Sequence, residues 1–231
     1  EKIPIGYYDK VLLEGLARNR GLQANWHNKK FSKVYEYIAN NKNHLDYACG
    51  PGTFIGNYSN INSIGVDISE IQINYAIESY GKNFKFFVLD ESQNIPFDGI
   101  YDVITMIELI EHLDDNLVIQ ILNDLYDRLE IKGKIVLTTP NFRSTYSLIE
   151  LLVNIFGKVS YKEQHINKFN EKKLLKLLNK TRFNEIKIEK FLNFGIFLSF
   201  FSVSSALRLN NFIEKLFSGK LGYLLIAELK K

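Results

Sequence analysis

The sequence predicts one α/β domain whose core is a doubly wound sheet of seven strands. Short segments rich in β-branched and aromatic residues alternate with longer amphipathic segments, and this alternation is typical of strands connected by helices. The 231 residues are 46% hydrophobic and 24% charged with a formal net charge of +3, which fits a single hydrophobic core and excludes a disordered chain. Because Cys49 is the only cysteine, a fold built on disulfide bonds within the chain is excluded as well.

The expected elements begin with helices and continue with strands. Residues 1–40 are expected to form an N-terminal helical cap, since residues 7–40 are amphipathic and precede the first strand. A helical insertion is expected before the last strand. Seven segments have the composition of strands: 44–47, 63–67, 84–89, 101–107, 134–139, 184–191 and 222–229.

Two further helices are expected between these strands. After Asp114 and Asp115, which can cap a helix start, apolar residues recur at helical spacing: Val118, Ile121, Leu122, Leu125 and Leu129. We expect this helix to end near Gly133, because glycine commonly terminates helices. The second helix is expected over residues 171–179, where leucines occupy one side and lysines the other.

A glycine-containing turn follows the first expected strand directly, in the run Asp46-Tyr47-Ala48-Cys49-Gly50-Pro51-Gly52. The second strand then ends in Asp67. Glycine allows the backbone to approach a ligand closely, and an acidic residue at the end of the next strand can accept hydrogen bonds from both hydroxyls of a ribose. A dinucleotide would require a third glycine where Ile55 stands, so a ligand with a single adenosine-like ribose is favoured.

This pattern resembles motif I of the class I S-adenosylmethionine-dependent methyltransferases, with Ala48 at the first glycine position. The resemblance continues through Asp90 and the fourth-strand run YDVITMIELIEHL and covers most of the chain. It implies a Rossmann-like fold with an antiparallel last strand and S-adenosylmethionine as the cofactor. Residues 41–140 would form the cofactor-binding half and residues 141–231 the substrate-side half.

The same resemblance assigns roles to individual residues. Asp46, Gly50 and Gly52 would line the methionine moiety of the cofactor, Asp67 would bind its ribose, and Asp90 would lie beside the adenine amine. Because alanine is small, we expect a slightly altered turn at Ala48 rather than a lost site. The complete set expected to contact the cofactor is Asp46, Ala48, Gly50, Gly52, Asp67, Ile68, Asp90 and Ile107.

Acidic and histidine side chains gather just after the fourth strand. Glu108, Glu111 and His112 stand at i, i+3 and i+4, so in a helical turn they would share one face at the carboxyl edge of the sheet. With His165 they form a candidate set of four ligands for Mg, Mn or Zn. Without a metal, His112 or His165 would act as the general base, and Glu111 completes the candidate catalytic set.

The E-x-x-E-H run and the later H-x-x-K-F run resemble two metal-assisted groups, the ubiquinone-biosynthesis O-methyltransferases and the terminal 2'-O-methyltransferases of small RNAs. The match to the first group extends through Thr138-Thr139-Pro140-Asn141 to the HINKFNEKKL segment. We therefore expect O-methylation of a small or lipophilic acceptor. The alternatives are metal-dependent 2'-O-methylation of an RNA end, which the small net charge disfavours, and a cofactor-binding protein without catalysis.

The segment 191–217 is unusually apolar, and eight phenylalanines fall between Phe183 and Phe217. Its longest apolar run is interrupted and too short to span a bilayer. One hypothesis is a lid for a lipid or prenyl acceptor that rests on a membrane surface, with Arg208, Lys215 and Lys220 facing anionic headgroups. The alternative is a helical hairpin packed into the domain. We expect a cytoplasmic protein, because the single cysteine fits a reducing compartment and the first residues lack the apolar core of a signal peptide.

The N-terminal region is also rich in aromatic residues, notably in the run Asn25-Trp26-His27-Asn28-Lys29-Lys30-Phe31. One hypothesis makes it a lid over the cofactor, with a lysine facing the methionine carboxylate. The alternative is an amphipathic helix packed on the sheet.

Overall fold

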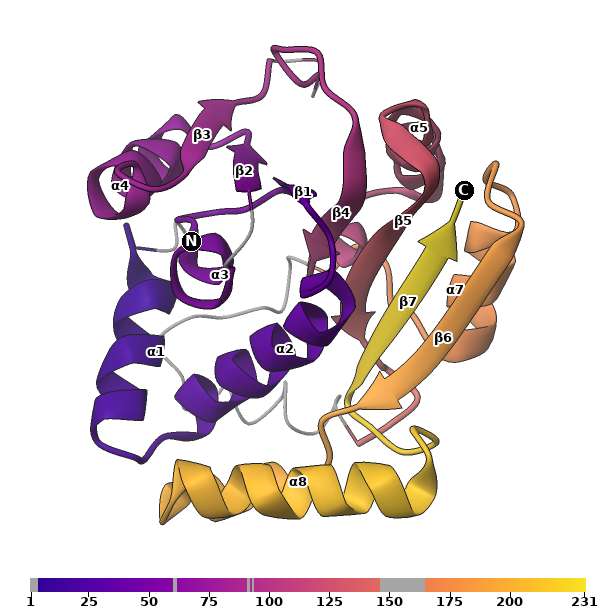
Figure 1. Ribbon diagram of the computed structural model, residues 1–231. Helices are drawn as coiled ribbons and strands as arrows, with labels where there is room; N and C mark the ends of the chain where they lie inside the picture. The colour runs from indigo at the N-terminus through magenta and orange to yellow at the C-terminus, as the bar shows by residue number, and fades with distance from the viewer. Residues whose placement is uncertain (1–3, 60–61, 91, 93, 146–164) are drawn as a thin grey trace.

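The computed structural model describes residues 4–59, 62–90, 92, 94–145 and 165–231 (Figure 1). Seven strands form one sheet in the order β3-β2-β1-β4-β5-β7-β6, which confirms the predicted fold class. All seven predicted strand segments are present, with bounds that differ by a few residues. The strands are β1 (Asn43–Tyr47), β2 (Asn62–Asp67), β3 (Lys85–Val88), β4 (Tyr101–Ile107), β5 (Leu129–Pro140), β6 (Glu185–Phe191) and β7 (Leu224–Lys230).

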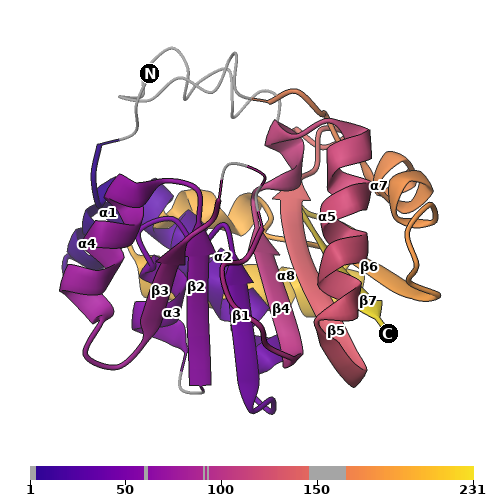
Figure 2. The same ribbon diagram turned by 90° about the horizontal axis from the view of Figure 1, so that it is seen from above.

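The sheet is parallel except around its last strand. β1 pairs in parallel with both β2 and β4, while β7 pairs antiparallel with β5 and β6, as the resemblance implied. Figure 2 shows β7 pointing opposite to its neighbour β5. Since the chain order reverses between β1 and β4, the crevice at the carboxyl ends of these two strands is the expected place for a ligand.

Helices cover both faces of the sheet. On one face lie α2 (Leu22–Ile38) and α3 (Thr53–Tyr58), which share an apolar core with the sheet, and α4 (Glu70–Tyr80) packs beside α3. On the other face α5 (Asp115–Asp127) and α7 (Glu171–Leu178) bury their apolar stripes against the strands. The expected insertion before the last strand is present as η2 (Phe194–Phe200) and α8 (Val203–Phe217), and α8 runs across the end at which β6 finishes (Figure 1).

The predicted end of the helix before β5 is wrong. α5 stops at Asp127, and Leu129 already pairs with Tyr101 of β4. Gly133 lies inside β5, where the register with β4 shifts between Tyr101 and Val103. A Cβ at Gly133 would lie 2.9 Å from the Glu130 carbonyl oxygen and 3.1 Å from the Tyr101 carbonyl oxygen, so the glycine permits an irregular, tightly packed backbone at this register shift rather than ending a helix.

The N-terminal helices are fastened at two places. Asp9 of α1 (Tyr7–Ala17) is buried and accepts hydrogen bonds from the hydroxyls of Tyr75 and Tyr80 on α4, at 2.9 and 2.6 Å. After α1, the Asn19 side chain accepts from Ser204 N–H at 3.0 Å at the start of α8. The first helices therefore bridge the two ends of the sheet. Within the described ranges, no helix has the length and apolar character needed to cross a membrane.

Candidate active site

The glycine turn after β1 is built from left-handed backbone conformations. Ala48, Gly50 and Gly52 have φ of 63°, 53° and 73°. Ala48 therefore keeps the turn shape at a cost of about 1–2 kcal/mol. A Cβ at Gly52 would lie 2.8 Å from a ring carbon of Phe86, whereas a Cβ at Gly50 would meet nothing within 4 Å. The Gly50 side of the turn is thus open, as a close-approaching ligand requires.

Asp67 connects the end of β2 to this turn. One carboxylate oxygen accepts from Gly50 N–H and the other from Ser69 N–H, both at 2.8 Å. Burial raises the pKa of Asp67, and the backbone N–H groups of Ser69, Gly50 and Ile68 oppose that rise. A carboxylate has about four acceptor positions, so capacity remains for the two hydroxyls of a ribose.

The other predicted cofactor residues surround the same edge of the sheet. Asp46 is buried at the end of β1 and accepts from the Thr105 hydroxyl at 2.5 Å; burial raises its pKa to about 7. Ile68 is exposed beside Asp67, and Ile107 is half-buried at the end of β4. Asp90 is exposed, and hydrogen bonds from the Asn94 backbone and side-chain N–H groups lower its pKa.

Glu111, His112 and His165 meet beyond the carboxyl end of β4. Their potential ligand atoms lie within 4.8 Å of one another, and the two imidazole centroids are 5.2 Å apart. Glu111 is buried and accepts from the Thr139 hydroxyl at 2.9 Å. Burial, with a smaller contribution from the Glu108 charge, raises the pKa of Glu111 to about 8. One carboxylate and two imidazoles suit Zn or Mn, so this trio fits a divalent metal.

Glu108 does not join the trio, although the sequence pattern predicted that it would. It follows β4 with a φ of 53°, and the turn after it is a short 3-10 helix, η1 (Ile110–His112), rather than an α-helix. The expected common face therefore does not form. Glu108 instead pairs with Lys30 of α2, whose side chain is almost fully buried.

Two residues that hold the trio, and the partner of Glu108, were not singled out from the sequence. Asn167 donates its backbone N–H to the Glu111 carbonyl at 2.9 Å and its side-chain amide to the Leu113 carbonyl at 2.6 Å, which docks His165 against His112. Thr139 orients Glu111, and Lys30 holds Glu108. Asn167 and Thr139 stand in the runs that extended the family resemblance, but their contacts only appear once β5 and the segment before α7 are placed.

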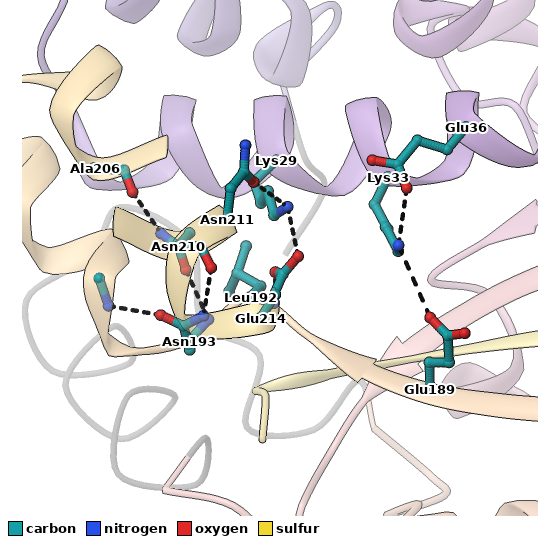
Figure 3. Close-up of polar contacts among 11 residues, drawn as sticks. Lys29, Lys33, Glu36, Glu189, Leu192, Asn193, Ala206, Asn210, Asn211 and Glu214 are labelled. Atoms are coloured by element: carbon teal, nitrogen blue, oxygen red, sulfur yellow. Dashed lines mark hydrogen bonds and ion pairs between the residues drawn. The ribbon is translucent and has the colours of Figure 1, made fainter. Parts of the chain in front are cut away.

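A separate cleft of about 460 Å³ lies between α2, β6 and α8, away from the glycine turn. Figure 3 shows its charged side chains directed at one another: Lys29 donates to Asn211 and Glu214, both at 2.7 Å, and Lys33 pairs with Glu36 at 2.8 Å. These internal pairs make the cleft a junction between α2 and α8. The lysine expected to face a methionine carboxylate is therefore not Lys29, and Lys30 is engaged by Glu108.

Comparison with known proteins decides the family. The sequence model of the family described as "Methyltransferase domain" matches residues 16–187, which is more than half of the chain. The chain belongs to this methyltransferase family. It is an S-adenosylmethionine-dependent enzyme, as the glycine turn and Asp67 indicated.

Solved structures share the fold of this methyltransferase. A SAM-dependent methyltransferase from Archaeoglobus fulgidus is 25% identical, with 87% of this chain and 92% of that chain covered and a TM-score of 0.59. A SAM-dependent methyltransferase from Thermotoga maritima, described as a possible histamine N-methyltransferase, is 15% identical, with coverage of 97% and 94% and a TM-score of 0.66. The plantazolicin methyltransferase in complex with SAH is 19% identical, with coverage of 97% and 87% and a TM-score of 0.58. No curated protein matches the sequence.

Proposed function

We propose that this methyltransferase methylates an oxygen atom of a small, lipophilic acceptor, as the ubiquinone-biosynthesis O-methyltransferases that its motifs resemble do. The observation that carries the proposal is the trio of Glu111, His112 and His165 at the carboxyl edge of the sheet, next to the turn for S-adenosylmethionine. Transfer of a methyl group to a hydroxyl oxygen leaves one proton, which a base must accept. The two histidines of the trio are the groups able to take it.

The residues of the trio differ in what they can do with a proton. At neutral pH the raised pKa of Glu111 keeps this carboxyl largely protonated, so it can donate a hydrogen bond to an acceptor oxygen. His112 and His165 are half-buried and lie at the surface of the trio, where an acceptor can reach them. We assign the base role to one of these two histidines and the orienting role to Glu111.

The same three residues would hold a divalent metal. When bound, such an ion lowers the pKa of the hydroxyls it contacts. Glu111, His112 and His165 would be its protein ligands, and Thr139 and Asn167 would fix their orientation through the hydrogen bonds described above.

The proposal is tested by an acceptor screen with S-adenosylmethionine over quinols, catechols, sugars and RNA ends, with and without chelator. We expect methylation of a vicinal dihydroxy aromatic compound, with loss of at least 100-fold in kcat for His112→Ala and unchanged binding of S-adenosylhomocysteine. Methylation of the RNA end alone would replace this proposal by the RNA alternative. If the protein binds S-adenosylhomocysteine but methylates no acceptor, with or without chelator, a cofactor-binding protein without catalysis would be favoured.

The lipophilic character of the acceptor rests on the surface formed by η2 and α8. Phe201, Phe212 and Leu216 are 75%, 63% and 63% exposed, which supports the membrane hypothesis over a hairpin packed entirely into the domain. The only acidic side chain of α8, Glu214, is turned inward to Lys29 and to the Leu192 N–H (Figure 3). The outward surface therefore combines apolar side chains with basic ones, which suits an anionic membrane surface that delivers a lipid or prenyl acceptor.

Flotation with vesicles of phosphatidylglycerol and phosphatidylcholine tests this part of the proposal. We expect the protein to float at low salt, and the variant Phe201→Ser/Phe212→Ser/Leu216→Ser to remain with the unbound fraction. Ile131→Ser is the matched control, because Ile131 is 87% exposed on β5, outside the η2 and α8 surface. Equal behaviour of the wild type and the triple variant would exclude this surface as the membrane contact.

A further inference from the structure

A buried chain of polar side chains crosses the sheet beneath the glycine turn. It joins three neighbouring strands: His44 and Asp46 belong to β1, Ser63 to β2 and Thr105 to β4. All four side chains are buried, with at most 3% exposure. Interior parallel strands are usually apolar, and each buried polar group costs free energy unless it is hydrogen-bonded. A polar chain at this position is therefore not explained by the fold alone.

The links of this chain are short. The Thr105 hydroxyl lies 2.5 Å from Asp46 Oδ1 and 2.8 Å from His44 Nε2. His44 Nδ1 lies 2.9 Å from the Ser63 hydroxyl, which in turn lies 2.6 Å from the hydroxyl of Ser59, after α3. Burial lowers the pKa of His44 to about 3, so the imidazole is neutral and has one donor and one acceptor nitrogen.

The proton positions in this hydrogen-bond chain depend on the state of Asp46 Oδ1, the oxygen that contacts Thr105. If Asp46 is ionised, Thr105 donates to it and must accept from His44 Nε2–H; His44 Nδ1 then accepts from Ser63, and Ser63 accepts from Ser59. If Asp46 is protonated on Oδ1, it donates to Thr105 and every link reverses, so His44 carries its proton on Nδ1. A proton on Oδ2 leaves Thr105 donating to Oδ1 and the links unchanged. An Nε2–H tautomer of His44 therefore accompanies every state in which Thr105 donates to Asp46.

We propose that Thr105 and His44 are positioning residues that hold Asp46 as an ionised, fixed acceptor for the α-ammonium group of S-adenosylmethionine. Asp46 Oδ2 has no hydrogen-bond partner among the described residues, whereas Oδ1 is held by Thr105. The open side of Gly50 lies in the same turn, four residues along the chain. One oxygen is therefore fixed from behind while the other remains available to a cationic ligand.

The surroundings of Asp46 explain why such support is needed. Burial raises the pKa of Asp46, and the negative charge of Asp67 on β2 raises it further by a smaller amount. Cys49, in the same turn, is a neutral thiol because burial raises its pKa. His44 on β1 is neutral as well. Thr105 on β4 is the only described side chain that donates a hydrogen bond to Asp46, so without it the carboxyl would be protonated more readily.

The inference assumes the cofactor site of the proposed function but not its acceptor, so it is tested with S-adenosylhomocysteine alone. Thr105→Val removes the hydroxyl at nearly constant volume, Thr105→Ser restores it, and Ser63→Ala removes a hydroxyl at the far end of the same chain. At pH 6.5 we expect Thr105→Val to weaken binding about tenfold or more, with a smaller loss at pH 8, because a higher pH ionises Asp46 without help. Thr105→Ser should bind within about threefold of the wild type, and Ser63→Ala should lose less than Thr105→Val.

A second measurement determines directly which nitrogen of His44 is protonated in this hydrogen-bond chain. In ¹⁵N spectra of the histidine side chains, His44 should carry its proton on Nε2 in the complex at pH 7. Thr105→Val should weaken this preference for Nε2. Wild-type affinity in Thr105→Val, an equal loss at both pH values, or a His44 proton on Nδ1 in the complex would each overturn the proposal. None of these results would bear on which oxygen is methylated.

Discussion

The burial of the ion pair between Lys30 and Glu108 predicts how much free energy of unfolding is lost when the pair is broken. The side chain of Lys30 is 4% exposed and that of Glu108 is 24% exposed. Removing one partner of a fully buried pair costs about 3–5 kcal/mol, while exposed pairs contribute about 0–1 kcal/mol. Because Glu108 keeps access to water, we expect Lys30→Met to lower the free energy of unfolding by about 1–3 kcal/mol. Methionine retains the apolar stem, and the contact of the ammonium with the Phe31 ring, 5.1 Å from the centroid, is lost as well.

A double-mutant cycle in urea with Lys30→Met, Glu108→Gln and the double variant isolates the pair. We expect a coupling energy of about 1–2 kcal/mol, since Glu108→Gln removes the charge that Lys30→Met leaves unpaired. The released Glu108 should also strengthen binding of Mn or Zn to the trio in Lys30→Met but not in the double variant, as measured by calorimetry. Strictly additive effects on stability, or identical metal affinities in the two variants, would refute the role assigned to this pair.

Three further predictions concern the cofactor turn and the buried acids. Asp67→Ala should weaken S-adenosylhomocysteine binding by roughly 10²–10⁴-fold in calorimetry, because two charge-assisted hydrogen bonds of about 1.5–3 kcal/mol each are lost; unchanged affinity would contradict the ribose role. The free energy of unfolding of Gly50→Ala should lie within about 1–2 kcal/mol of the wild-type value, although this variant should lose cofactor binding. Gly52→Ala should be the less stable of the two variants, because its Cβ would lie 2.8 Å from the Phe86 ring. The pKa of Glu111 in the folded state, about 8, lies above its value in the unfolded state, so between about pH 4.5 and 8 the folded state binds more protons than the unfolded state. The melting temperature should therefore fall as the pH rises through this range. Glu111→Gln should make the melting temperature less dependent on pH.

The strands were predictable because each is a short apolar segment bounded by polar or glycine residues, and the antiparallel last strand followed from the family resemblance. The end of α5 was not predictable from its apolar spacing, since Leu129 satisfies the helical period and also the pairing with Tyr101 that the sheet provides. Spacing alone also placed Glu108 with Glu111, because i, i+3 and i+4 share a face only where the backbone is helical. The positive φ of Glu108 and the distant Lys30 depend on tertiary contacts that no local pattern records.

Thr105 and His44 show a different limit of sequence reasoning. Each stands inside a segment that reads as an ordinary buried strand, and the polar residues interrupt the apolar pattern without forming a recognisable motif. Their relation becomes visible only through the register of β1 with β2 and β4, which places the three strands side by side. By contrast, Asp46 and Asp67 could be selected in advance because both belong to a local pattern: Asp46 opens the run that contains the glycine turn, and Asp67 ends the next strand.

The contacts of α2 and of the segment after α1 with α8 have a consequence for synthesis of the polypeptide. Lys29 and Glu214 are 185 residues apart, and so are Asn19 and Ser204. At roughly 5–20 residues per second, α2 waits on the order of 10–40 seconds on the ribosome before these partners exist. During this interval Trp26 lacks Tyr223, on which it stacks in the finished protein, and the apolar side of α2 has no cover from η2 and α8. Nascent chains that stop before residue 203 should therefore be the species that chaperones hold.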